Sequence, residues 1–126
     1  MSDDLHDRGM ATRRKVLGDE YVDAALANAD EFSRDLQRMI TEFAWGGVWS
    51  RDGLSLKQRS LNNLGMLAAL NRPHELEIHL RGALNNGCTP DEIRETFLQV
   101  AIYAGFPAAV DAFRVARRVL SESGAI

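Results

Sequence analysis

The chain has 126 residues, a formal net charge of -3 and a single cysteine. At this size folding buries roughly two-thirds of the surface of the unfolded chain, so we expect one domain over residues 1–126. The near-balance of charge gives no field that would attract nucleic acid or an anionic membrane, and one cysteine excludes an intramolecular disulfide.

No segment approaches the roughly 20 apolar residues that span a bilayer, and the amino terminus lacks the apolar stretch of a secretory leader. We therefore expect a cytoplasmic protein without membrane contact. Helix signals run through the whole chain, and no stretch alternates like a half-buried strand. The predicted fold class is an all-α bundle of about six helices.

The first half predicts a helix over residues 5–17 that ends at Gly18, and one or two more over residues 22–43. Residues 45–53 interrupt the pattern. They hold three glycines and two tryptophans, which favours an ordered loop that covers another part of the protein.

The second half predicts four helices, over residues 55–70, 73–86, 89–105 and 106–121. Pro73 suits a first helical position, and Gly87 suits the left-handed residue after a helix. Thr89, followed by Pro90 and Glu92, predicts an N-cap with a capping box.

Glu75 and His79 form the best acid/base pair in the sequence, because they are neighbours on one helical face. A nearby carboxylate orients an imidazole and raises its pKa. His79 also borders the apolar stripe of Leu76 and Leu80, which predicts partial burial. From the pattern alone, such a histidine is more often a packing residue than a catalytic one.

Arg59 and Arg81 are the candidate holders of an anionic substrate, since guanidinium groups bind carboxylates through paired hydrogen bonds. The alternative for Arg81 is an ordinary surface pair with Glu77, and for Arg59 a solvated position in the first turn. Trp45, Trp49 and Tyr103 are candidates for lining a pocket, although such aromatic residues are more often core.

Metal chemistry is not expected, because His74 and His79 are five residues apart whereas metal-binding pairs on a helix sit three or four apart. The sequence also holds no glycine-rich phosphate loop and no serine nucleophile elbow. These patterns favour a reaction without a metal or other cofactor.

Four sequence words, in order and at matching spacing, resemble the gamma-carboxymuconolactone decarboxylase family of the alkylhydroperoxidase D-like superfamily. They are ELEIHLR at residues 75–81, NNG at 85–87, DEI at 91–93 and AIYAGFPAA at 101–109. The resemblance extends to WGGVW at 45–49 and RSL at 59–61, and more loosely to residues 13–18, so it covers nearly the whole chain.

The resemblance implies a compact helical subunit that assembles into a homo-oligomer, a trimer or a hexamer. It implies a cofactor-free decarboxylase that converts gamma-carboxymuconolactone, or a related carboxylated lactone, to beta-ketoadipate enol-lactone in aromatic catabolism. His79 and Glu75 lie in the motif ELEIHLR, and the resemblance implies that these two residues are catalytic. Arg59 or Arg81 is then expected to hold the acetate arm of the substrate.

Two alternatives stay open. A thiol-dependent hydroperoxidase of the alkylhydroperoxidase D branch needs a C-x-x-C pair, but Arg72 and Glu75 occupy those positions and Cys88 lies outside them. A non-catalytic small-molecule-binding scaffold is the other. Asn62 and Ala104 depart from the usual family pattern, which leaves the identity of the lactone open.

Overall fold

The computed structural model describes residues 2–126, with side-chain burial from residue 4 onward. Every regular element in this range is a helix, which confirms the predicted all-α class. None of the described helices is both long and apolar enough to cross a bilayer. The residues form two compact units, one ending at Leu56 and the other comprising Lys57–Ile126. The single domain expected from chain length stays a prediction.

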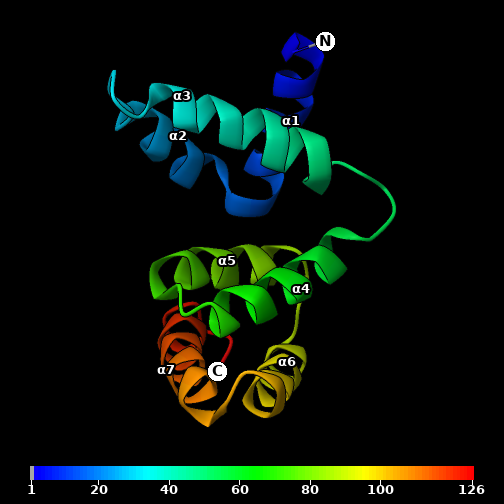
Figure 1. The fold of residues 1–126 in the computed structure, drawn as a ribbon, viewed down its shortest axis with the longest axis vertical. Coiled ribbons are helices and arrows are strands. Elements are labelled where there is room, and N and C mark those ends of the chain that lie inside the picture. The colour runs from blue at the N-terminus through cyan, green and yellow to red at the C-terminus, as the bar shows by residue number, and fades with distance from the viewer. Residues whose placement is uncertain (1) are drawn as a thin grey trace. The chain divides into compact units, whose positions relative to one another are not determined.

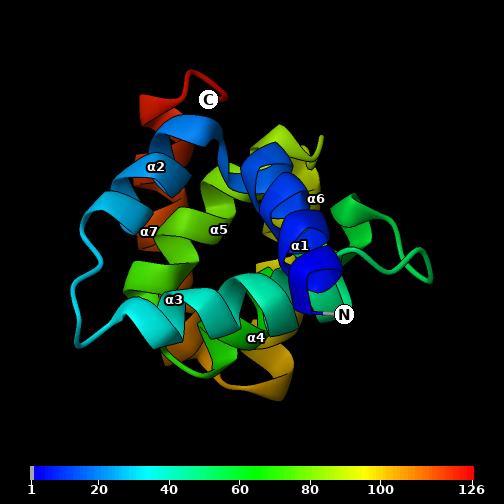
Figure 2. The same ribbon diagram turned by 90° about the horizontal axis from the view of Figure 1, so that it is seen from above.

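The first unit is built from three α-helices and a π-helix: α1 (Ser2–Leu17), α2 (Asp19–Ala27), α3 (Arg34–Met39) and η1 (Ile40–Trp49). Gly18 ends α1 with a positive φ of 90°, as the sequence predicts, and the chain turns there into α2 (Figure 2). The helix α3 continues directly into η1, and Figure 1 shows the two as one helical ribbon.

The loop predicted over residues 45–53 is wrong for its first part, because residues 45–49 belong to η1. The glycines were read as helix breakers, whereas Gly46 allows α1 to approach closely. A Cβ atom at Gly46 would lie 2.3 Å from the carbonyl oxygen of Leu5, and one at Gly9 would lie 2.0 Å from that of Thr41. Helices that touch through their backbones require glycine at the contact.

The second unit contains the remaining four helices: α4 (Leu56–Ala69), α5 (Pro73–Asn85), α6 (Pro90–Tyr103) and α7 (Phe106–Glu122). Local signals predicted them well. Pro73 begins α5, and Thr89 and Glu92 form the capping box of α6. Gly87 and Gly105 both have positive φ, at 87° and 104°.

A core of buried apolar side chains joins the four helices of the second unit. Leu64 on α4, Leu80 on α5 and Phe97 on α6 are each 0% exposed, and Phe97 meets Phe113 of α7 edge-on at 6.0 Å between ring centroids. Figure 1 shows α4 and α5 in one layer and α6 and α7 in the other. This core fixes the helix α5, which carries the predicted catalytic residues.

Candidate active site

The helix α5 places His79 at the edge of the core. Leu76, Leu80 and Ala83 of the same helix are buried, as the stripe beside His79 predicts. The imidazole is partly buried, and its Nδ1 atom is inaccessible to solvent. A titratable ring held at the boundary of a core is suited to acid/base chemistry, because its proton affinity depends on its surroundings.

The pKa of His79 is lowered, whereas the sequence predicts that it is raised. Burial lowers it from 6.5 to about 4, because desolvation disfavours the charged imidazolium. The expected rise through Glu75 is therefore wrong. At pH 7 the imidazole of the substrate-free protein is neutral and presents one N–H donor and one ring nitrogen acceptor.

Glu75 lies exposed in the first turn of α5. In the part of the chain that the structure describes, no hydrogen bond or ion pair joins its carboxylate to His79. The spacing of four residues puts the two side chains on one helical face, but an exposed carboxylate stays in water instead of contacting the ring. Its role in the reaction stays a prediction.

Arg81 is engaged on the other side of α5. Its guanidinium lies 2.8 Å from a carboxylate oxygen of Glu122 and 3.8 Å from one of Glu77. Glu77 in turn accepts a hydrogen bond from Arg118, and this bond holds the pKa of its carboxyl below the usual value. Residues two apart on a helix project in nearly opposite directions, so Arg81 and His79 face different sides. The geometry therefore favours the alternative of a surface ion pair for Arg81, with Glu122 of α7 as its nearer partner and Glu77 as the other.

Arg59 lies near the start of α4 and is partly buried, with its Nε atom inaccessible to solvent. Arg59 is therefore less exposed than the solvated position that was the alternative for this residue. The side-chain amide of Asn86 donates to Ser60 Oγ at 2.9 Å and so sets the register of α4 against α5.

Trp45 and Trp49 belong to the first unit, where they lie one turn apart on η1. Their rings stack with centroids 4.7 Å apart and an interplanar angle of 27°. Trp45 is 3% exposed, and its carbonyl oxygen accepts a hydrogen bond of 2.7 Å from Ser50 Oγ. The pair therefore has a packing role within this unit, and a role in lining a substrate pocket stays a prediction.

Tyr103 is 85% exposed at the end of α6. It lines an open groove of about 430 Å³ between α4 and α6, together with Asn62 and Ala104. None of the residues that line this groove comes from α5, so the groove does not include His79. The two departures from the family pattern thus meet in space, although 42 residues separate them in the sequence.

Sequence reasoning missed one buried cation, Arg13 on α1, which is 4% exposed. Its guanidinium donates to Gln37 Oε1 at 2.9 Å and to Thr41 Oγ1 at 3.1 Å. The basic run at residues 13–15 is typical of a solvated surface. Gly9, Arg13 and Val16 are all buried at spacings of four and three, which is the signal that the residue faces inward.

Cys88 is 4% exposed, and its thiol donates to the carbonyl oxygen of Lys57 at 3.7 Å. Burial raises the pKa of this thiol to about 11, and Glu92 adds to the rise, whereas Lys57 opposes it. The thiol is therefore protonated at pH 7 and a poor nucleophile. This chemistry does not support the thiol-dependent hydroperoxidase.

Comparison with known proteins identifies the family to which this chain belongs. The family model described as the carboxymuconolactone decarboxylase family matches residues 34–118. The chain belongs to this family. The match includes η1, all of α4 to α6 and most of α7. All the candidate site residues of this chain lie within it.

Two relatives match nearly the whole chain. The nitrosuccinic acid decarboxylase of Metarhizium robertsii is 46% identical over 125 residues, covering 96% of this chain and 87% of the relative. The 4-carboxymuconolactone decarboxylase of Acinetobacter baylyi is 44% identical over 117 residues, covering 93% and 87%. This member of the carboxymuconolactone decarboxylase family is a carboxy-lyase.

Proposed function

We propose that the chain decarboxylates gamma-carboxymuconolactone to beta-ketoadipate enol-lactone without a bound cofactor. The likeness to the Acinetobacter baylyi enzyme across 93% of the chain is the main support. The substrate supplies its own electron sink. When the bond to the carboxylate breaks, the electron pair delocalises through the ring alkene onto the lactone carbonyl, carbon dioxide leaves, and one proton must be added to carbon.

His79 is the group that we assign to this anion. In the free protein its imidazole is neutral, since its pKa is about 4. A bound dianionic substrate raises the pKa of a neighbouring histidine, because it stabilises the imidazolium. The proton taken up with the substrate then stabilises the developing oxyanion and is available for transfer to the ring carbon. Each turnover consumes one proton, which the imidazole regains from water.

Arg59 is the residue that we assign to the acetate arm of the substrate. Arg81 is the weaker candidate, because it pairs with Glu122 and faces away from His79. In this assignment the guanidinium of Arg59 binds the far carboxylate, while the reacting carboxylate lies near His79. The apolar edge of the core beside His79 favours loss of that reacting carboxylate, because it solvates the charge poorly.

Nitrosuccinic acid is a second candidate substrate, favoured by the 46% identity to the Metarhizium robertsii enzyme. The two compounds share their reacting centre. In each, the carbon that loses the carboxylate also bears a CH₂–carboxylate arm and an electron sink, which is a conjugated lactone in one and a nitro group in the other. The same arginine and imidazole therefore serve both reactions.

One experiment tests the proposal and ranks the two substrates. Purified protein is incubated with each compound, and product and carbon dioxide are measured by mass spectrometry to give kcat/KM. We expect turnover of the lactone with the higher kcat/KM. A higher value for nitrosuccinate would replace the lactone by the second candidate, and no turnover of either compound would refute the proposed substrate class. The His79→Ala variant gives the background rate.

A further inference from the structure

A small hollow lies between α6 and α7, which pack against each other in the second unit. Its volume is about 230 Å³, and no described residue of α4 or α5 lines it, so it is separate from the residues assigned to the reaction. Its floor is formed by Ile93 and Phe97 of α6 and by Ala116 and Leu120 of α7, each at most 6% exposed. We call this hollow the α6–α7 pocket.

The pocket follows from the spacing of residues on the two helices. On α6 it is lined at positions 90, 93 and 97, and on α7 at positions 113, 116 and 120, so each helix contributes one face. The α7 face places Ala116 one turn from Phe113 and one turn from Leu120. A single methyl group between two large side chains leaves a hollow in a region that is otherwise closely packed.

The turn after α7 adds a third apolar wall. Gly124 has a positive φ of 78°, and the chain reverses there. The backbone N–H groups of Ala125 and Ile126 both donate to the carbonyl oxygen of Leu120, at 2.8 and 3.3 Å. These bonds hold Ile126 beside the pocket, which its side chain lines.

The charged residues of the lining are two exposed arginines, Arg94 and Arg117. The guanidinium of Arg94 lies 2.9 Å from a carboxylate oxygen of Asp91 and 3.6 Å from one of Glu95. Arg117 forms no hydrogen bond or ion pair with any residue that the structure describes. None of the described residues that line the pocket is an Asp or Glu. The charge of Arg117 is therefore available to an anionic ligand.

We propose that the α6–α7 pocket binds an aromatic monocarboxylate, with the ring on the apolar floor and the carboxylate on Arg117. A cavity of about 150 Å³ lined by Leu, Ile and Phe holds benzene, so this larger pocket has room for one ring and a carboxylate. Phe97 and Phe113 meet edge-on at 6.0 Å, and a ligand ring can pack against such a pair in the same way. A guanidinium binds a carboxylate through two parallel hydrogen bonds.

The composition of the pocket distinguishes its ligand from the proposed substrates, and the proposal does not depend on the reaction. Gamma-carboxymuconolactone and nitrosuccinic acid each carry two carboxylates, whereas the pocket offers one arginine that is not already paired with a carboxylate. A mainly apolar lining with a single charged anchor is typical of sites for small amphipathic ligands.

Isothermal titration calorimetry of the full-length protein tests this site with benzoate as the probe. Benzoate should bind at least about tenfold more tightly than acetate, which lacks the ring. Arg117→Gln should weaken benzoate binding at least about fivefold and leave binding of benzyl alcohol within about twofold, because only the contact to the carboxylate is lost. Ala116→Leu should weaken binding of both ring compounds at least about tenfold, because the larger side chain fills the pocket.

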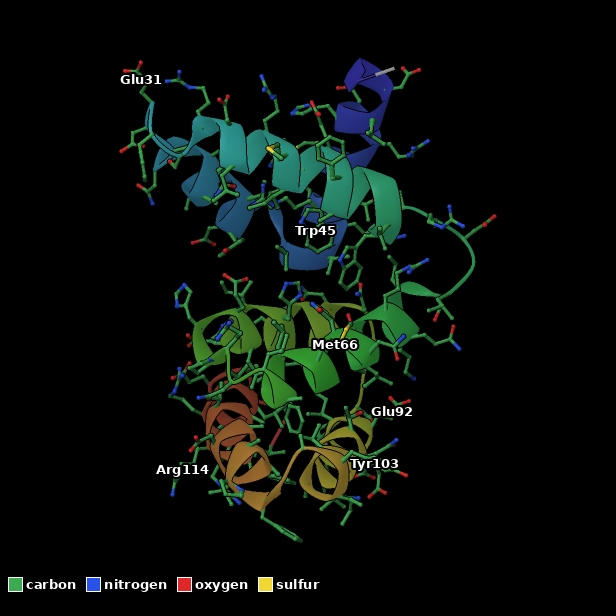
Figure 3. The ribbon with its side chains drawn as sticks, viewed as in Figure 1. Glu31, Trp45, Met66, Glu92, Tyr103 and Arg114 are labelled. Carbon is green, nitrogen blue, oxygen red and sulfur yellow. The ribbon has the colours of Figure 1, made fainter. Side chains whose placement is uncertain are left out.

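Two further variants separate this site from other cations of the chain. Arg114→Gln is the matched control, since it removes the same charge from the same helix, and Figure 3 shows Arg114 on the side of α7 that lies away from α6. Arg59→Gln removes the arginine assigned to the substrate. Both variants should bind benzoate like the wild type, and circular dichroism checks that every variant keeps its helices.

Four results would overturn the proposal. The first is a wild type that does not bind benzoate, and the second is equal binding of benzoate and acetate, which would indicate surface ion pairing only. The third is unchanged benzoate binding in Arg117→Gln. The fourth is loss of binding in Arg59→Gln, which would place the probe in the site of the reaction.

Discussion

His79 has a pKa of about 4 in the substrate-free structure, and this value restricts how the residue can act. An imidazolium present before substrate binding would bind any anion. If the neutral imidazole gains its proton together with the substrate, the imidazolium is present only when the substrate is bound. The cause is the apolar edge of the core around Leu76 and Leu80, which costs the charged form its solvation.

The His79→Ala variant should lose about 100 to 10,000-fold in kcat on the confirmed substrate, because the acid/base group is removed. Glu75→Gln should cost at most about 10-fold, since the exposed carboxylate makes no bond to the ring in the described structure. Steady-state kinetics measure both, with circular dichroism as the folding control. Near wild-type kcat for His79→Ala would remove His79 from the mechanism and direct attention to Arg59.

The Cys88→Val variant should keep kcat within about twofold of wild type. The thiol is buried and protonated at pH 7, and it donates a weak hydrogen bond to the backbone carbonyl of Lys57. The measurement is the same kinetic assay. Loss of most activity in a folded Cys88→Val protein would show that a thiol takes part in the reaction.

At the level of helices, the crossing of α1 and η1 depends on two glycines that have no side chain to keep the backbones apart. Gly9 and Gly46 are both buried at this crossing. Gly47 is the next residue of η1, but a Cβ atom there would make only an ordinary van der Waals contact, 3.7 Å from the carbonyl oxygen of Glu42. Adjacent glycines of one helix thus have different constraints.

Gly46→Ala should lower the free energy of unfolding by about 3 kcal/mol or more, because its methyl group would overlap the backbone of Leu5. Gly47→Ala is the matched control and should be neutral or stabilising by up to about 1 kcal/mol, because alanine is the better helix former. Urea unfolding followed by circular dichroism measures both. Equal stabilities for the two variants would show that the close crossing does not form.

For the molecule as a whole, the burial of His79 links stability to pH. The unfolded chain binds the histidine proton with a pKa of 6.5, whereas the folded chain binds it only at about 4. The unfolded state therefore carries more protons between these values, and stability rises with pH there. The contribution is complete above pH 6.5 and is lost as the pH falls to about 4.

His79→Gln should remove this dependence. Between pH 7 and pH 4 the wild type is expected to lose up to about 3 kcal/mol more unfolding free energy than the variant, as follows from 1.36 kcal/mol per pKa unit. Chemical denaturation at several pH values measures the difference. Parallel curves for the two proteins would show that His79 titrates alike in the folded and unfolded states.

The sequence by itself determined the helical class, most helix ends in the second half and the family. These properties depend on local chemistry, such as Pro73 at a helix start, the hydroxyl of Thr89 at an N-cap and a left-handed Gly87. The motif at residues 75–81 identifies His79 as the catalytic candidate for the same reason, because its residues are close together in the sequence.

Only the tertiary structure decided which distant residues meet and what their surroundings do. Residues 45–49 form a helix where a loop is predicted, and Gly46 lies there against the backbone of Leu5. Arg81 forms an ion pair with Glu122 of α7. Asn62 and Tyr103 came together in one groove away from His79. Backbone approach, ion pairing between helices and desolvation all depend on contacts between remote segments. A pattern read along the chain does not contain them.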